Sequence, residues 1–331
     1  RRVPGAGSER EPGDAARARP GPHALVTRLT RPSFAVLVLA ACGLFQVRAQ
    51  PPPPESYHVR VDVQLVLVSA SVSTRDGHPV TDLGQDSFEV YENGQPRPIQ
   101  MFERQTALPL QLVLLIDASL SAAKELPVQK EALGRFIQRV LRPLDAAALL
   151  QLSSKDRVLA EFSSDGASLQ TKLRTIRPHA GTALYDALVE ASGKLKDRQG
   201  RRVIVVISDG NDTVSKKDFH TALRAIQEAE ATLFALVVRP IQGESGRSVR
   251  GEHALMTFAD LTGGRAFFPA ATLELDRFFD ELSALLRTQY LIGYQPAPPS
   301  YQPEFRTIEV RVKGTDYAVR HRKGYYSEPR E

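Results

Sequence analysis

Five oxygen-bearing side chains stand where short apolar runs of the sequence end or where a helical pattern begins. They come from three separate segments and are Asp117, Ser119, Ser121, Thr182 and Asp209. Two carboxylates and three hydroxyls suit a small hard cation such as Mg²⁺, which takes oxygen ligands and retains bound water. In open α/β sheets, ligands bind outside the carboxyl ends of the strands, where all three segments are expected to lie. The sequence therefore predicts a site for one divalent cation.

The order and spacing of these residues resemble a von Willebrand factor A-type domain with a metal-ion-dependent adhesion site. The first motif reads DxSxS over Asp117–Ser121, the second is Gly181–Asp186, and the third is Ser208–Thr213. DxSxS alone is a weak pattern, but the three motifs in this order form a strong one. The resemblance covers roughly 109–287 and is closest to the bacterial secreted members of the family.

The resemblance implies a role for each residue of the set. The hydroxyls of Ser119, Ser121 and Thr182 are expected to bind Mg²⁺ (or Mn²⁺) directly. Asp117 and Asp209 are expected to bind it directly or through water. The ion then accepts one more carboxylate, from a Glu or Asp side chain of a protein partner.

Two nearby residues bear on this site. Asp186, one helical turn beyond Thr182, is expected to orient the loop as an acceptor in the second shell rather than to bind the metal. Leu120 stands where the family usually has Gly. A leucine side chain at that position is expected to affect access to the metal.

Local structure offers simpler roles for the same residues. Asp117 and Thr182 are also candidates for helix N-caps, and Asp209 for a turn after a strand. For His179 an exposed loop position is the simpler interpretation. Asp212 and Thr213 are candidates to hold the loop after Asp209, and a cap of the following helix is the simpler interpretation. The convergence of three loops favours the metal site, because caps require no such convergence.

Alternating strands and helices are expected to position these loops. Apolar runs predict strands at 110–116, 146–152, 158–162, 203–207, 233–238 and 265–268. Helical periodicity appears at 122–141, 168–176, 183–195, 218–229, 253–261 and 273–286. Strands that alternate with helices of this length indicate an α/β fold with a doubly wound, mainly parallel sheet that is covered on both faces.

The segments on either side have β patterns. Upstream, 58–68 alternates polar and apolar residues, and 88–91 is expected to form a hairpin with 98–102 around the turn Asn93-Gly94. Downstream, strands are expected at 290–294, 307–312 and 318–322. Neither flank is long enough to bury a core alone, so we expect both to join in one β-sandwich that carries the inserted A-type domain.

These expectations divide the chain into six parts. They are an export signal and upstream segment at 1–49, a Pro-rich linker at 50–54, the first part of the β-sandwich at 55–108, the A-type domain at 109–288, the second part of the β-sandwich at 289–326, and a tail at 327–331.

The segment 1–49 has the layout of an export signal. Arg28 and Arg31 precede the apolar stretch 34–45, and Ala49 closes a tolerable cleavage site. The stretch is short for a membrane span. Cleavage after Ala49 is the first expectation; lipidation at Cys42, as in a bacterial lipobox, and an uncleaved anchor are the alternatives. The protein is thus expected to be exported (periplasmic, cell-surface or secreted), with any membrane attachment through this segment.

Composition excludes some classes of function. The net charge is +5, but 1–49 contains eight Arg and three acidic residues, so the rest of the chain is neutral and does not indicate a nucleic-acid partner. Cys42 is the only cysteine, which leaves no disulfide framework and no thiolate site in the globular part.

A metal-dependent protein-binding or adhesion module is therefore the first hypothesis. Motifs of zinc proteases, serine hydrolases, P-loop enzymes and dinucleotide-binding enzymes are missing from the sequence, so no enzymatic activity is expected. A metal-independent structural or assembly module of the cell envelope is the alternative. A metal-assisted hydrolase is a third hypothesis, and His179 and Asp186 are its candidates for the general base.

Overall fold

The computed structural model describes residues 65–104, 108–153, 155, 157–238, 248–269, 274–314 and 316–327. All of them belong to one compact unit, Arg60–Glu331. The expected export signal with Cys42, the linker 50–54, and most of the strand predicted at 58–68 lie outside the described residues. Within the described part of the chain, no helix is both long and apolar enough to cross a membrane.

A six-stranded sheet forms the centre of the fold, in the order β10-β9-β8-β5-β6-β7. Its strands are β5 (Leu110–Ile116), β6 (Ala146–Gln151), β7 (Val158–Ser163), β8 (Arg201–Ser208), β9 (Thr232–Val237) and β10 (Ala266–Phe267). All neighbours pair in parallel except β6 and β7. Every residue of β5 is buried, as expected for a central strand covered on both faces. The six strands predicted from apolar runs are confirmed.

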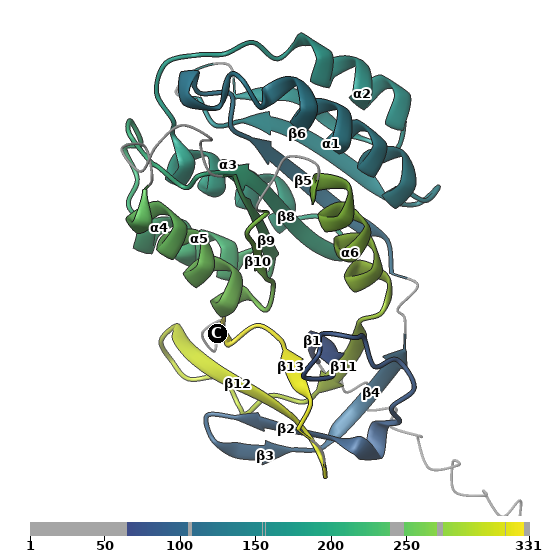
Figure 1. The fold of residues 1–331 in the computed structure, drawn as a ribbon. Coiled ribbons are helices and arrows are strands. Elements are labelled where there is room, and N and C mark those ends of the chain that lie inside the picture. The colour runs from purple at the N-terminus through teal and green to yellow at the C-terminus, as the bar shows by residue number, and fades with distance from the viewer. Residues whose placement is uncertain are drawn as a thin grey trace, which may run out of the picture. The chain divides into compact units, whose positions relative to one another are not determined.

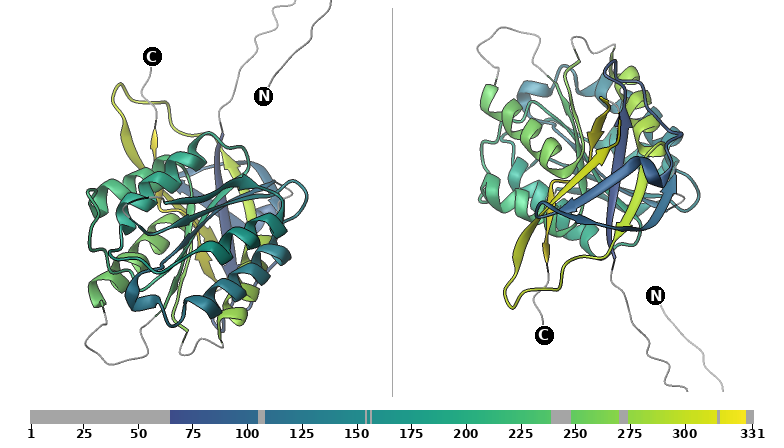
Figure 2. Two further views of the ribbon diagram at one scale, coloured as in Figure 1. Left: turned by 90° about the horizontal axis from the view of Figure 1, so that it is seen from above. Right: turned by 90° about the horizontal axis from the view of Figure 1, so that it is seen from below.

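Helices cover both faces of this sheet, as Figures 1 and 2 show. On one face lie α1 (Leu126–Val140), α2 (Gly166–Thr175) and α6 (Leu275–Arg287), and on the other α3 (Leu184–Lys196), α4 (Phe219–Glu228) and α5 (Val249–Thr262). Alternate residues of β5 separate the two cores. Leu112 and Leu114 belong to the first, and Val113 and Leu115 to the second. The predicted doubly wound, mainly parallel sheet is therefore confirmed.

The two flanking segments build two further sheets, ordered β13-β1-β11-β4 and β14-β12-β2-β3. Their elements are β1 (Val66–Ser73), the 3-10 turn η1 (Gln85–Ser87), β2 (Phe88–Glu92), β3 (Gln95–Arg97), β4 (Ile99–Arg104), β11 (Tyr290–Tyr294), β12 (Glu304–Val312), β13 (Ala318–Arg320) and β14 (Gly324–Ser327). Both sheets combine strands from the two flanks, which lie side by side in the view from below in Figure 2. A third core joins the sheets through residues such as Val68, Phe88, Tyr290 and Ile308. The predicted β-sandwich is thus confirmed.

The upstream hairpin differs from the prediction in its second strand. Asn93 and Gly94 form the expected turn with positive φ values of 50° and 75°, but β2 pairs there with β3. Pro98 then separates β3 from β4, and β4 pairs instead with β11 in the other sheet, with Phe102 opposite Ile292. Proline has no N–H to donate to a continuous ladder, so the chain changes sheets at this residue. The short strand β14 was also not predicted.

The flanking sheets meet the central sheet at the amino ends of its parallel strands. The Lys323 N–H donates to the Leu261 carbonyl (3.0 Å), close to the start of β10. The Arg322 guanidinium donates to Glu230 (2.6 Å), which lies just before β9. The loops at the carboxyl ends therefore lie at the opposite end of the strands, away from the β-sandwich.

Candidate metal centre

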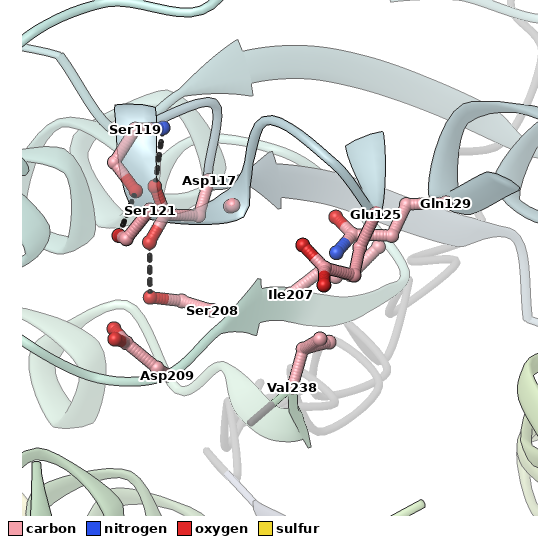
Figure 3. Close-up of a pocket in the computed structure, with 10 residues that line it drawn as sticks. Asp117, Ser119, Ser121, Glu125, Gln129, Ile207, Ser208, Asp209 and Val238 are labelled. Atoms are coloured by element: carbon pink, nitrogen blue, oxygen red, sulfur yellow. Dashed lines mark hydrogen bonds between the residues drawn. The ribbon is translucent and has the colours of Figure 1, made fainter. Parts of the chain in front are cut away.

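The loop after β5 places Asp117 beside the end of β8. Ile116 and Ile207 are paired across these neighbouring parallel strands, so Asp117, the first residue after β5, lies beside Ser208, the last residue of β8. The Asp117 N–H donates to the Ile207 carbonyl (2.9 Å), which continues the pairing one residue beyond the strand. Ser208 Oγ donates to Asp117 Oδ2 (2.8 Å), as Figure 3 shows. One carboxylate oxygen is thereby fixed in direction.

The serines of the DxSxS motif are held next to the same carboxylate. The Ser119 N–H donates to Asp117 Oδ1 (2.8 Å). The 3-10 turn η2 (Leu120–Ala122) follows, and the hydroxyl oxygens of Ser119 and Ser121 lie 2.9 Å apart (Figure 3). Asp117 and Ser119 are both buried. Three of the five predicted ligands are therefore brought together by one short loop.

A small cavity joins these residues to Asp209. Its volume is about 10 Å³, room for one water molecule or one ion. It is lined by Asp117, Ser119, Ser121, Ala122, Glu125, Gln129, Ile207, Ser208, Asp209 and Val238. Four of the five predicted ligands thus face one cavity.

Sequence reasoning did not identify Glu125 and Gln129, which come from the start of α1. Both side chains line the cavity and are only 6% and 2% exposed. Figure 3 shows them next to each other and apart from Ser119 and Ser121. Gln129 Oε1 is buried without a hydrogen-bond partner in the described part of the chain. A signal was present in the sequence, because Gln129 falls on the helix face otherwise formed by apolar residues such as Leu126 and Leu133.

The cavity disfavours a second negative charge when it contains no cation. Burial raises the pKa of the Asp209 carboxyl group. The N–H of Asn211, which donates to Asp209 Oδ1 (2.9 Å), acts in the opposite direction, and the nearby Asp117 carboxylate raises the pKa again. A divalent cation between the two carboxylates would reverse this repulsion.

The loop before α3 lies next to the DxSxS loop without adding Thr182 to the cavity lining. The His179 N–H donates to the Ala118 carbonyl (2.8 Å), and Ser119 and His179 form an isolated parallel bridge. Thr182 is buried, its N–H donates to Thr213 Oγ1 (2.8 Å), and its carbonyl accepts from the Thr213 N–H (2.9 Å). These bonds use the main chain of Thr182, so a ligand role for its hydroxyl remains a prediction.

Two carboxylates outside the cavity fasten the surrounding loops. Asp186 accepts from the backbone N–H groups at 216 (3.0 Å) and 217 (2.9 Å), so the loop that it orients is the one after β8. Asp212 accepts from the Leu184 N–H (2.8 Å) and therefore caps α3 from a neighbouring loop. The expectation that Asp212 caps the following helix is wrong, because Asp218 caps α4.

Neither Leu120 nor His179 faces the cavity. Leu120 is 67% exposed and does not have a positive φ, so a leucine costs no backbone strain there and leaves the cavity lining unchanged. His179 is half-buried, and its Nδ1 lies 3.0 Å from the Gly181 carbonyl oxygen.

Carboxylates and imidazoles alone do not form a metal site here. In the described ranges, no three His, Cys, Asp or Glu side chains are grouped closely enough to hold an ion. Hydroxyl or amide oxygens must therefore complete any donor set at this cavity.

Comparison with known proteins agrees with the topology of the central sheet. Residues 112–211 match the von Willebrand factor type A domain. That range contains most of β5, all of β8 and the loop residues that bear the five predicted ligands. A search of curated proteins gave no match.

Solved structures similar to the chain include a von Willebrand factor type A protein from Catenulispora acidiphila (14% identity, 73% of this chain and 74% of that chain, TM-score 0.48). The pilus adhesin SpaC from Lactobacillus rhamnosus GG, in an open conformation, is similar at 10% identity. The match covers 73% of this chain and 42% of SpaC, with a TM-score of 0.47. An aerotolerance-related membrane protein from Bacteroides fragilis is similar at 18% identity. The match covers 54% of this chain and 98% of that protein's chain, with a TM-score of 0.44.

The fold assignment rests on the strand order and on the domain match. The centre of the molecule has the α/β fold of a von Willebrand factor A-type domain, with a mainly parallel sheet and helices on both faces. Flanking sheets from both ends of the chain accompany it.

Proposed function

We propose that this protein is a binding module that holds one Mg²⁺ or Mn²⁺ at the candidate metal centre and uses it to capture an acidic side chain of a protein partner. The observation that carries the proposal is the convergence of Asp117, Ser119, Ser121 and Asp209 on one cavity of ionic size. Carboxylate and hydroxyl oxygens are the ligands that Mg²⁺ prefers.

The residues around the cavity fit such an ion. Asp117 and Asp209 supply the two negative charges that balance a divalent cation, and Ser119 and Ser121 add neutral oxygens. When bound, the ion would supply the Lewis acidity that attracts a partner's carboxylate. Thr182 is retained in this proposal as a ligand on the resemblance alone.

We propose a binding role rather than a catalytic one. His179 and Asp186, the two candidates for a general base, do not line the cavity. The Asp186 carboxylate is already engaged by two backbone N–H groups. A leucine at 120 that obstructed the metal would favour the metal-independent alternative, but the Leu120 side chain is 67% exposed and does not line the cavity. The export signal expected at 1–49 would deliver the module outside the cytoplasm.

Calorimetric titration of Mg²⁺ and of Mn²⁺ into the full chain tests the proposal. One saturable site is expected, and Asp117→Ala should abolish it, whereas Asp86→Ala, an exposed carboxylate on the β-sandwich side, should not. Because Asp117 also accepts hydrogen bonds from Ser119 and Ser208, the milder Asp117→Asn is measured as well, with circular dichroism to check folding. Absence of saturable binding by the wild type, or binding unchanged in both folded Asp117 variants, would contradict the proposal.

A further inference from the structure

The chain crosses from one sheet of the β-sandwich to the other between β13 and β14. The first of these strands ends at Arg320 beside β1, and the second begins at Gly324 beside β12. The three residues in between, 321–323, form a crossing segment. Its Lys323 N–H donates to the Leu261 carbonyl (3.0 Å) of the A-type domain. The crossing segment therefore joins both sheets of the β-sandwich to the A-type domain.

An imidazole completes the ladder between the crossing segment and β12. The Ile308 N–H donates to the Lys323 carbonyl (2.9 Å). Two residues further along β12, the Val310 N–H donates to His321 Nε2 (3.1 Å). Alternate residues of an antiparallel strand face the same neighbour, so the ring stands where a main-chain carbonyl would otherwise accept. A side chain that can titrate thus holds the crossing segment to β12.

Only the neutral form of the His321 ring can make both of its hydrogen bonds. Because Nε2 accepts, Nδ1 carries the proton and donates to the Arg322 carbonyl (2.8 Å). The His321 side chain is 4% exposed, and Val310 is 4% exposed. Protonation places a second donor on Nε2, opposite the Val310 N–H, and two donors cannot bond each other. The buried Val310 N–H then lacks its acceptor, which disfavours the closed arrangement.

The surroundings of the crossing segment are tight on one side and hollow on another. A Cβ at Gly263, the residue that follows α5, would lie 2.4 Å from the main-chain carbonyl carbon of His321. A cavity of about 200 Å³ lies beside the segment, lined by Asp260, Gly263, Gly264, Ala318, Val319, Arg320, His321 and Lys323. A space of this size has room for several water molecules. Water is therefore at hand when the protein bonds of the segment are lost.

Charged groups from several elements surround the ring. They are Glu309 on β12, Asp260 on α5, Glu230 before β9, and Arg320, Arg322 and Lys323 on the chain around His321. Burial lowers the pKa of His321 from its ordinary value of 6.5, and Lys323 lowers it further. The hydrogen bond to the Arg322 carbonyl and the two carboxylates of Glu309 and Asp260 raise the pKa in part. The net shift is downward, so the ring is neutral at neutral pH.

We propose that the crossing segment is a pH-sensitive joint, in which protonation of His321 releases Val310 and loosens the contact with the A-type domain. Acid favours the open form, because an open segment returns the ring to water and to its ordinary pKa of 6.5. The open population should rise by up to about tenfold per pH unit between 6.5 and the folded-state pKa. The proposal does not depend on metal binding, because none of these residues lines the candidate metal centre.

Hydrogen–deuterium exchange of the full chain tests the joint, over a pH series from about 7.5 to about 4.5. Wild type is compared with His321→Gln at each pH, since glutamine offers an acceptor to the Val310 N–H but does not titrate. At acid pH the wild type should lose protection at 308–312 and 320–324 by about tenfold or more relative to the variant, at exchange times at which β8 is still protected. His220→Gln, which changes an exposed histidine of α4, should behave as the wild type does.

Equal protection of the wild type and folded His321→Gln at acid pH would overturn the proposal, as would a loss that only keeps pace with β8. If His321→Gln does not fold, Lys323→Gln takes its place. The Lys323 charge disfavours the imidazolium, so its removal should reduce the acid-induced loss several-fold. Lys172→Gln on the exposed surface of α2 is the matched control and should change nothing. A loss as large in Lys323→Gln as in the wild type would contradict the joint.

Discussion

Gly210→Ala is the most informative single substitution, because Gly210 follows the predicted ligand Asp209 directly. Its φ is +80°, in the left-handed region that L-residues disfavour. A Cβ at this position would lie 2.4 Å from the carbonyl carbon and oxygen of Gly251, at the start of α5. Backbone atoms cannot rotate away from such a contact, so the loop after β8 must move and carry Asp209 with it.

The cost of this substitution has two parts. Holding an alanine in the left-handed conformation costs about 1–2 kcal/mol. Relieving the contact with Gly251 costs about 1–3 kcal/mol, the usual range for overpacking. The free energy of unfolding should therefore fall by about 2–5 kcal/mol, a large part of the about 5–15 kcal/mol typical of a folded domain. If the proposed metal site is correct, Mg²⁺ affinity should also fall by about 10–100-fold, as when groups that orient ligands are displaced.

Two other glycines supply the controls. Gly263 has φ +82° and an equally close contact, 2.4 Å from His321, but it lies at the amino end of β10. Gly263→Ala should cost a similar free energy and leave Mg²⁺ affinity unchanged. Gly193 is an exposed residue of α3 with no atom within 4 Å of the added Cβ, so Gly193→Ala should stabilise the protein by about 0.5–1 kcal/mol.

Urea unfolding followed by circular dichroism gives the stabilities, and calorimetry gives the Mg²⁺ affinities. A Gly210→Ala protein as stable as the wild type would refute the argument from close approach. Equal destabilisation of Gly210→Ala and Gly263→Ala, with Mg²⁺ affinity retained in both, would support the packing argument but refute the role of Asp209 as a ligand.

Three further predictions concern titration and capping. Burial raises the pKa of Asp209 in the folded protein above its unfolded value of 3.8. Without metal, the wild type therefore loses stability as pH rises from 3.8 through the folded-state pKa. Asp209→Asn should therefore be the more stable protein in EDTA at neutral pH, with the difference vanishing near pH 3.8 in pH-dependent urea unfolding. Burial lowers the pKa of His321, whose Nε2 accepts from the Val310 N–H (3.1 Å), so stability should fall as pH falls from 6.5 toward the folded-state pKa. In His321→Gln the melting temperature should depend less on pH over that range than in the wild type. An equally steep dependence in both proteins would contradict this. Asp212→Ala should lower the free energy of unfolding by about 1 kcal/mol, because the Leu184 N–H at the start of α3 loses its acceptor. Urea unfolding measures this change, and an unchanged free energy would show that water replaces the cap.

The central sheet could be predicted from the sequence because its signals are local. Each buried strand is a short apolar run, and each helix between two strands has its own periodicity. Strand pairing in the flanks is not local in this sense. The segment 98–102 is a short, mainly apolar run, and nothing in it specifies pairing with β11, about 190 residues away, rather than with β2. Pro98 was the available clue, since it cannot continue a ladder.

The candidate site was predictable only in part for a similar reason. DxSxS and Asp209 follow directly from strands, so parallel pairing of β5 and β8 was enough to bring them together. Glu125 and Gln129 reach the same cavity from α1, and their approach depends on how that helix packs. Asp212 shows the same limit, since its partner at Leu184 belongs to a helix that starts 28 residues earlier.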